Sequence, residues 1–353
     1  HVDLGGNMVS FGGFLLPTQY SGINHEHMIV RSKAGLFDIS HMGEFIISGT
    51  DAETFLQKVT VNDVQSLEVG QAHYSAMCYK HGGIVDDLLV YKKEDEFMVV
   101  VNASNREKDF DWLTSNIQGN VMIKDISEIM ALIAIQGPRS KDILQMLTDS
   151  NLSNLQFYHF VDGKVSGQEA IISRTGYTGE LGYEIYSSSN DIINVWNQIM
   201  DAGLDHGIEP VGLGCRDTLR MEMKYTLYGN DIDETTNPIE TGLGWITRLK
   251  KDEFIGKEAL VKAKKNVTRR LVCIEMAEKA IPRNGYPIFI DEELVGMITS
   301  GTMSPSLEKG IGIGFVNTPY TEAGTDLLID IRGKKKPAVI VKPPFYTKGS
   351  LMD

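Results

Sequence analysis

Two stretches of this chain share the same order of expected elements, and this order constrains the fold more than any other feature. Residues 45–59 and 131–147 are each expected to form a strand, a glycine-containing turn and a helix. In both cases antiparallel strands and then a second helix are expected to follow. Such an order predicts an α+β fold that contains a duplicated unit. The prediction rests on element order and not on residue identity.

Alternating apolar residues and residues that favour helix starts define the expected elements of each unit. The first unit is expected to hold a helix over 52–59, strands over 72–79, 84–92 and 97–102, and a helix up to about residue 117. The second is expected to hold a strand over 131–136, a helix over 140–147, strands over 169–173 and 182–187, and a helix over 190–202. The expected helix caps are Thr50 or Asp51, a capping box of Ser104 and Glu107, and Ser188 or Ser189. Residues 214–225 are expected to form one more helix, and residues 1–30 an ordered segment without a clear period.

The pattern changes near residue 265. From Arg270 onward, short β-rich runs alternate with Gly, Pro and Asn turns. This spacing predicts a small β-barrel or β-sandwich. We therefore divide the chain into residues 1–265, with two α+β subdomains and internal divides near 45 and 130, and a C-terminal domain of residues 266–353.

Composition excludes several classes of function. The net charge of −13 argues against broad binding to nucleic acid, because the phosphates would be repelled. Cys78, Cys215 and Cys273 lie far apart and have no metal-ligand spacing, so no metal site is expected. No apolar run approaches the roughly 20 residues that a membrane span needs. Without a recognisable signal or transit segment, bacterial cytoplasm is the expected location, or the mitochondrial matrix for a eukaryotic chain.

Two adjacent carboxylates lie inside an expected strand that follows Gly82-Gly83. Because side chains alternate along a strand, Asp87 shares a face with Leu89 and Tyr91, and Asp86 points the other way. The two carboxylates therefore cannot have the same role. Burying either charge is costly unless it is paired, so the alternative is an exposed strand whose aspartates face water.

Two further stretches carry candidate binding residues. Glu184 follows a glycine-rich connection at 174–182, where glycines allow close approach of a ligand. Arg216 and Arg220 lie four apart on one expected helix face, and an intrahelical salt-bridge lattice is the alternative there. Asp38 and His41 are a candidate pair, although a packed or exposed histidine is the more common situation. Together these residues suit a planar heteroaromatic ligand with an anionic tail.

A long series of motifs resembles the T-protein family of the glycine cleavage system, the aminomethyltransferases. The motifs include GLFDISHMG at 35–43, GGIVDDLLVY at 82–91, RTGYTGELGYEI at 174–185, RDTLRME at 216–222 and LYGNDIDETT at 227–236. The resemblance implies two interleaved ferredoxin-like subdomains and a C-terminal β-barrel, arranged as a cloverleaf around a folate pocket. It implies transfer of a one-carbon unit from the aminomethyl-lipoyl arm of H-protein to tetrahydrofolate, with release of ammonia and formation of 5,10-methylenetetrahydrofolate.

The resemblance also implies roles for individual residues. The catalytic aspartate of the family corresponds to Asp87, and Tyr91 lies on the same strand face. The implied folate-binding residues are Tyr74, Tyr91, Asn102, Tyr177, Glu184, Arg216 and a C-terminal aromatic, Tyr346. Phe345 is an equal candidate for this last position, and the choice between the two stays open.

The implied co-substrate is tetrahydrofolate, the implied partner is lipoylated H-protein, and no metal, nucleic acid or membrane is expected. Two alternatives share this fold. One is a folate-dependent demethylase domain for sarcosine-like amines, but a flavin-binding half is missing. The other is a non-catalytic folate-binding relative, but none of the three cysteines lies in the Lys-Gly-Cys-Tyr-like motif that marks such relatives.

Overall fold

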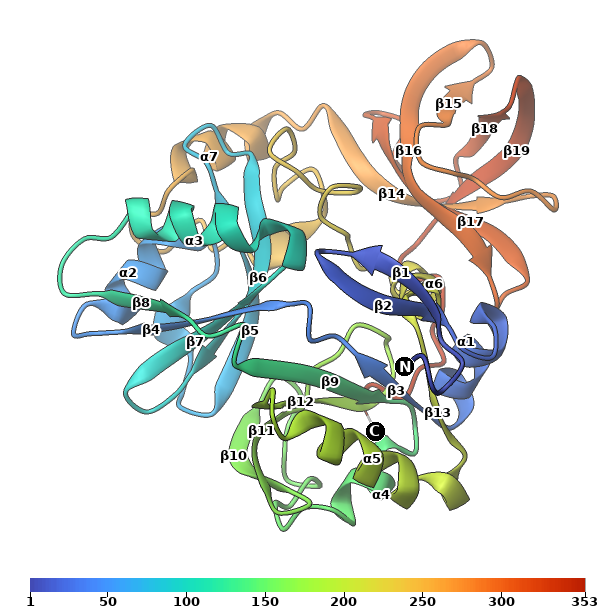
Figure 1. Ribbon diagram of the computed structural model, residues 1–353. Coiled ribbons are helices and arrows are strands. Elements are labelled where there is room, and N and C mark those ends of the chain that lie inside the picture. Colours follow the sequence, from blue (N-terminus) through green and yellow to red (C-terminus); the bar gives the residue numbers. More distant parts are fainter. Residues whose placement is uncertain (353) are drawn as a thin grey trace.

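The computed structural model describes residues 1–352 as three lobes around a central helix, α6 (Leu213–Glu222) (Figure 1). Two lobes are α+β and the third is a β-barrel, so the expected α+β cloverleaf with a C-terminal barrel is confirmed. Helix α6 packs against elements of the N-terminal segment and of the barrel. No helix among the described residues is long and apolar enough to cross a membrane.

The first lobe is an antiparallel sheet with helices packed against it. Its strands, in spatial order, are β5 (Gln71–Cys78), β6 (Ile84–Lys92), β7 (Glu96–Val101), β4 (Gly43–Ser48) and β8 (Met122–Asp125). The helices are α2 (Ala52–Val59) and α3 (Arg106–Ser115). Phe45, Leu56 and Val90 belong to the apolar core between sheet and helices. The opposite face of the sheet is not covered by these helices and faces the interior of the molecule.

The second lobe repeats this design with one additional strand. Its strands, in spatial order, are β10 (Phe160–Val165), β11 (Gln168–Ser173), β12 (Gly182–Ser188), β9 (Met130–Gln136), β3 (Ala34–Asp38) and β13 (Ile208–Pro210). Its helices are α4 (Ser140–Gln145) and α5 (Ile192–Ala202). Tyr183, Ile185 and Val195 lie in its core.

The duplication is visible in the topology. Both lobes run strand, helix, three strands, helix, strand along the chain, and the fourth strand of each unit pairs with the first. In the first lobe the fifth strand, β8, pairs directly with β4. In the second lobe β3, which precedes both units in sequence, is inserted between β9 and β13. The two lobes are therefore interleaved, as the family resemblance implied.

The C-terminal lobe is a closed barrel rather than a sandwich. Its strands, in order around the barrel, are β14 (Arg269–Met276), β17 (Lys309–Asn317), β16 (Glu293–Ser304), β15 (Pro287–Ile290), β18 (Asp326–Ile331) and β19 (Lys334–Val341). Helix α7 (Lys257–Lys265) precedes the first of them. Ile274, Ile288 and Ile329 lie in the barrel interior.

The N-terminal segment contains regular elements that its sequence does not announce. A hairpin of β1 (Asn7–Phe11) and β2 (Phe14–Gln19) turns at Gly12-Gly13, both with positive φ. Helix α1 (Ile23–Ser32) follows, and the carboxylate of Glu26 accepts hydrogen bonds from the backbone N–H groups before it. The buried side of α1 carries Glu26, His27 and Arg31, so the apolar period that normally predicts a helix is weak here.

The expected side-chain caps are wrong in detail. Asp51 precedes α2, but its carboxylate accepts the N–H of Asn120 from a distant loop. Helix α3 starts at Arg106 after a 3₁₀ turn, so Ser104 and Glu107 do not form a capping box. Ser188 accepts the N–H of Asn190 in a turn that precedes α5. The side chains of Asp51 and Ser188 therefore accept N–H groups of a distant loop or of a turn and do not cap a helix, which a local pattern cannot anticipate.

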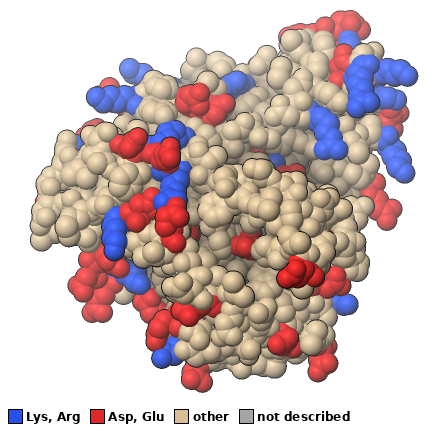
Figure 2. Space-filling model, in the orientation of Figure 1, with Lys and Arg blue, Asp and Glu red and all other residues tan. Residues whose placement is uncertain are grey.

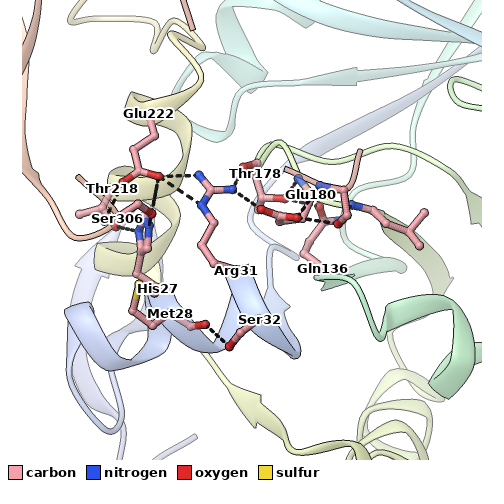
Figure 3. Close-up of polar contacts among 12 residues, drawn as sticks. His27, Met28, Arg31, Ser32, Gln136, Thr178, Glu180, Thr218, Glu222 and Ser306 are labelled. Carbon is pink, nitrogen blue, oxygen red and sulfur yellow. Dashed lines mark hydrogen bonds and ion pairs between the residues drawn. The ribbon is translucent and has the colours of Figure 1, made fainter. Parts of the chain in front are cut away.

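A buried ionic cluster joins α1, α6, the second lobe and the barrel (Figure 3). Arg31 of α1 donates to Glu222 of α6 at 3.1 and 2.8 Å, and to Glu180 of the second lobe at 2.8 Å. Glu222 also accepts from Ser304 and Ser306 of the barrel. Burial alone would raise the pKa of Glu222, but hydrogen bonds and charges from His27 and Arg31 lower it to about 2.

The C-terminal tail completes this cluster. Ser350 donates its backbone N–H and its hydroxyl to Glu180, and the ring of Tyr346 lies 4.2 Å from the Arg31 guanidinium carbon. The tail therefore runs from the barrel back to the second lobe. Arg31 thus connects α1 with α6, the second lobe and this tail, and Glu222 extends the cluster to the barrel.

We expect Arg31→Met to lower the free energy of unfolding by about 3–5 kcal/mol, because it leaves Glu180 and Glu222 buried without their cation. Urea unfolding followed by circular dichroism measures this change. Arg139→Met is the matched control, since Arg139 is exposed and its ion pair with Asp142 is worth about 1 kcal/mol or less. Equal small effects of the two substitutions would contradict the structural role of the cluster.

Candidate active site

A cavity of about 830 Å³ lies where the two α+β lobes meet α6 and the loop after it. This volume is in the range of pockets that hold ligands of drug size. Its walls come from β5, β6 and β7, from β12 and the loop before it, from α6, and from the β1–β2 hairpin. Six of the predicted site residues line it: Tyr74, Asp87, Asn102, Tyr177, Glu184 and Arg216. Segments far apart in sequence thus meet at one cavity.

The two adjacent aspartates of β6 lie in different environments, as the strand alternation predicts. Asp87 lines the cavity and accepts hydrogen bonds from the Tyr74 hydroxyl and from the Asn102 side-chain amide, both at 2.8 Å. Asp86 is fully buried behind it and accepts from the backbone N–H of Asn102 and from the Asn105 amide. The Asn102 amide contacts both carboxylates, so it fixes their separation.

These carboxylates hold their protons more tightly than exposed aspartates do. Burial, followed by the charge of Asp86, raises the pKa of Asp87 to about 7. Burial also raises the pKa of Asp86, and burial together with Asp86 raises that of Asp109 to about 11. Asp109 is therefore protonated at neutral pH, while Asp87 titrates there. A group that titrates near neutrality is suited to accept and return a proton.

Glu184 and Arg216 lie on the other walls of the cavity. Glu184 of β12 accepts the Thr175 hydroxyl at 2.5 Å, and burial raises its pKa. The Arg216 guanidinium carbon lies 4.8 Å from the centre of the Tyr177 ring. Arg216 makes no side-chain hydrogen bond or ion pair with any described residue. Its donors therefore face the cavity.

The second arginine of α6 has a different role. Arg220 is paired with Asp231 at 2.8 Å and with Asp217 at 2.9 Å. The intrahelical pairing considered from the sequence therefore applies to Arg220 and not to Arg216. Arg220 holds the loop after α6, whereas Arg216 is available to a ligand.

Two predicted site residues lie outside the cavity. Tyr91 is fully buried between the lobes, where its hydroxyl lies 2.9 Å from that of Tyr186. Tyr346 packs on Arg31, and its neighbour Phe345 packs against an apolar cluster that includes Met221. Tyr91 shares the strand face of Asp87, but that face continues beyond the cavity into the interface with the second lobe. Of the described residues after the barrel, up to 352, only Pro343 lines the cavity.

Several lining residues were not identified as site residues from the sequence. Trp245 is 60% exposed and its ring lies 6.3 Å from that of Tyr74. Lys224 also lines the cavity, with a φ of 57° that is unusual for a residue with a side chain. No local pattern marks either residue. Phe11 also lines it, and its ring meets edge to face at 5.3 Å the ring of His41, which the sequence does mark as a candidate.

The candidate pair of Asp38 and His41 is not formed. The Asp38 carboxylate accepts the backbone N–H of Ser40 and lies 2.8 Å from Nε2 of His1. His41 follows in the connection between β3 and β4 and turns to the cavity. The Asp38 side chain therefore contacts residues near it in the fold, whereas the His41 side chain lines the cavity.

One part of the surface beside the cavity, the β1–β2 hairpin, is uncharged. The β1–β2 hairpin has no Lys, Arg, Asp or Glu, and Phe11, Phe14 and Leu15 are exposed on it. Figure 2 shows this area as a large tan surface near the centre, with Lys and Arg side chains on the barrel at the upper right and on the left side of the molecule. The described residues contain no group of His, Cys, Asp and Glu arranged to hold a metal ion.

Comparisons with known proteins identify relatives over the full length of the chain. The family model for the GCVT N-terminal domain matches residues 1–251, and that for the glycine cleavage T-protein C-terminal barrel domain matches residues 269–347. The aminomethyltransferase of Chloroherpeton thalassium is 49% identical over 351 residues, covering 99% of this chain and 97% of the relative. That of Geobacillus sp. (strain WCH70) is 47% identical over 348 residues, covering 98% and 96%. The crystal structure of the glycine cleavage system aminomethyltransferase T from Bartonella henselae superposes with a TM-score of 0.93 at 30% identity, covering 99% of this chain and 97% of that one.

We expect Asp86→Asn to lower the pKa of Asp87 by roughly 1–2 units, because it removes the nearest like charge. Carbon-13 NMR of labelled aspartate carboxyls, titrated across neutral pH, measures the shift. Glu44→Gln is the control: Glu44 is another buried carboxyl, outside the cavity, whose pKa burial raises to about 8. An unchanged Asp87 titration in Asp86→Asn would show that burial alone sets its pKa.

Proposed function

This chain belongs to the glycine cleavage T-protein family and is an aminomethyltransferase of the glycine cleavage system, and from that premise we propose that its cavity binds tetrahydrofolate and receives the one-carbon unit from a lipoylated H-protein. The correspondence over nearly the whole length of curated aminomethyltransferases supports this activity over a folate-dependent demethylase. The same correspondence supports aminomethyltransferase activity over a non-catalytic folate-binding function.

One observation carries the proposal for the ligand. The cavity has a half-buried carboxylate, Asp87, a buried one, Glu184, and an arginine, Arg216, that has no hydrogen-bond or ion-pair partner among residues 1–352. A reduced pterin presents a row of N–H donors on its amino-pyrimidine edge, and a carboxylate can accept two of these in parallel. The tail of a folate carries acceptor oxygens and carboxylates, which suit a guanidinium. The chemistry of the donors and acceptors in the cavity thus fits both ends of a folate.

Aromatic side chains support the same ligand. Tyr74, Tyr177 and Trp245 line the cavity, and flat apolar faces of this kind pack against a planar ring system. The Tyr177 hydroxyl donates to the backbone carbonyl of Thr226, and Arg216 lies over its ring, so its orientation is fixed. A rigid aromatic wall loses little entropy when a ligand binds.

Asp87 is the proposed catalytic residue. Tetrahydrofolate supplies the two nitrogens that accept the one-carbon unit, one in the pterin ring and one in the side arm. The carbon–nitrogen bond of the aminomethyl group breaks with loss of ammonia, and positive charge develops on the carbon. The carbon then forms a bond to each of the two folate nitrogens, while its bond to the lipoyl sulfur breaks and the dihydrolipoyl thiol is released. An ionised Asp87 facing the cavity stabilises that charge and moves a proton during ring closure. Tyr74 and Asn102 hold its carboxylate in one orientation.

Positioning supplies the rest of the rate acceleration in this proposal. Holding the two reactants in one cavity gives an effective-molarity advantage of about several kcal/mol. The uncharged surface of the β1–β2 hairpin beside the cavity supports the approach of the aliphatic lipoyl arm of H-protein, which carries no charge along its chain.

We expect Asp87→Asn to fold and to bind tetrahydrofolate while kcat falls at least about 100-fold, because the amide neither stabilises the cation nor accepts the proton. Ammonia release from aminomethylated H-protein measures turnover. Asp86→Asn is the matched variant one position away. It retains most turnover at neutral pH, because Asp86 does not face the cavity and the lower pKa expected for Asp87 keeps that carboxylate ionised. Near-normal turnover of Asp87→Asn beside an inactive Asp86→Asn would overturn the assignment.

We expect Arg216→Met to raise the Kd for tetrahydrofolate about 10- to 100-fold, because it removes a charged hydrogen-bond donor of the cavity. Intrinsic tryptophan fluorescence or calorimetry measures the Kd, and Arg139→Met is a control far from the cavity. Unchanged affinity in Arg216→Met would remove this residue from the folate site.

A further inference from the structure

His41 is buried at the cavity wall with no hydrogen-bond partner. Its side chain lines the cavity and the residue is 4% exposed. Neither ring nitrogen forms a hydrogen bond with any residue in the described range 1–352, and Nδ1 is shielded from solvent. A neutral imidazole always carries one N–H donor and one acceptor, so His41 presents an unused polar group.

Such an unpaired group is uncommon in a folded protein. Buried polar side chains nearly always have partners, because leaving one without a partner costs free energy. Other buried side chains with an unpaired polar atom, such as Glu44 and Tyr183, lie away from the cavity. Of the side chains with an unpaired buried atom in the described part of the chain, His41 is the one at the cavity wall. The other ring nitrogen, Nε2, is not among the shielded atoms, so it is the one that can donate to a ligand in the cavity.

The position of His41 is fixed by its backbone rather than by its side chain. The preceding residues are tied to the second lobe, since Ile39 donates to the carbonyl of Leu132 and the Ser40 hydroxyl contacts the same residue. The edge of the Phe11 ring meets the imidazole at 5.3 Å. The ring is thus held in place for a partner that the protein does not supply.

The charged neighbours of His41 identify which end of a ligand it faces. Its imidazole interacts with the charge of Arg216, and more weakly with that of Asp38, but not with Asp87. Burial, followed by the charge of Arg216, lowers the pKa of His41 to about 3, so the ring stays neutral. Beside a guanidinium, a neutral N–H donor suits an acceptor oxygen and not the donor-rich edge of a pterin.

We propose that His41 donates a hydrogen bond to an acceptor oxygen of the aminobenzoyl-glutamate part of the folate, next to Arg216. This inference rests on the proposed function, since it assigns a contact to the folate ligand. It adds a second donor at the acceptor-rich end of the cavity. His41 acts there as a binding residue and takes no part in proton transfer.

The test compares two ligands that share the pterin and differ in the tail. Tetrahydrofolate has the aminobenzoyl-glutamate group, and 6-methyltetrahydropterin lacks it. We expect His41→Leu to raise the Kd for tetrahydrofolate about tenfold and to leave that for the tetrahydropterin unchanged, as measured by calorimetry and competition. His41→Gln, which keeps an N–H donor, should recover part of the loss.

A matched control is available in the same chain. His73 also has a buried ring nitrogen without a partner in the described structure, and burial lowers its pKa to about 4, but it does not line the cavity. His73→Leu should change the affinity for neither ligand. If it weakens tetrahydrofolate binding as much as His41→Leu does, a general packing effect explains both and the proposal fails.

A spectroscopic measurement on the unmodified protein gives an independent result. Nitrogen-15 signals of the His41 ring should shift when tetrahydrofolate is added and stay in place when 6-methyltetrahydropterin is added. This measurement decides the question even where His41→Leu does not fold. Unmoved ring signals with tetrahydrofolate, or equal losses of both ligands in His41→Leu, would overturn the assignment. Absence of tetrahydrofolate binding by the unmodified protein is a different result and would contradict the proposed function itself.

Discussion

The ion cluster around Arg31 is the interaction on which the geometry of this molecule depends. Charges buried this deeply are stable only when every partner is present, because each unpaired ion carries a large desolvation cost. The partners come from the second lobe, the barrel and the C-terminal tail, so the cluster forms only when all of them are docked. Helix α6 presents Glu222 to this cluster and Arg216 to the cavity. The cluster therefore fixes the helix that carries one wall of the active site.

The cavity separates its chemistry by position. Asp87 and Glu184 lie on strands, and the donors Arg216 and His41, unpaired among the described residues, lie on α6 and on the β3–β4 connection. A ligand with donors at one end and acceptors at the other is oriented by this arrangement before any reaction occurs. Strand alternation gives Asp87 and Asp86 their separate roles, since one faces the ligand and the other modifies its neighbour through charge.

Much of this architecture follows from local sequence patterns. The repeated α+β order, the β5–β6 hairpin and the opposite faces of Asp86 and Asp87 depend on periodicity alone, and the structure agrees with all three. The features that the sequence does not predict correctly share one physical origin, which is contacts between residues far apart along the chain. Helix α1 buries charged residues whose partners are far away in sequence, so its amphipathic period is masked. Tyr91 has the expected face, but the second lobe covers it, which no local pattern reveals.

The insertion of β3 between β9 and β13 has a consequence for how the chain is made on the ribosome. Strand β3 ends at Asp38, while β9 starts at Met130 and β13 at Ile208. At about 5–20 residues per second, translation leaves this apolar strand without a pairing partner for roughly 5–20 s after it emerges. The first lobe, over 43–125, can complete its own sheet during that interval. The nascent protein thus carries a folded lobe beside an exposed strand, and its N-terminal end is among the last parts to reach its final place.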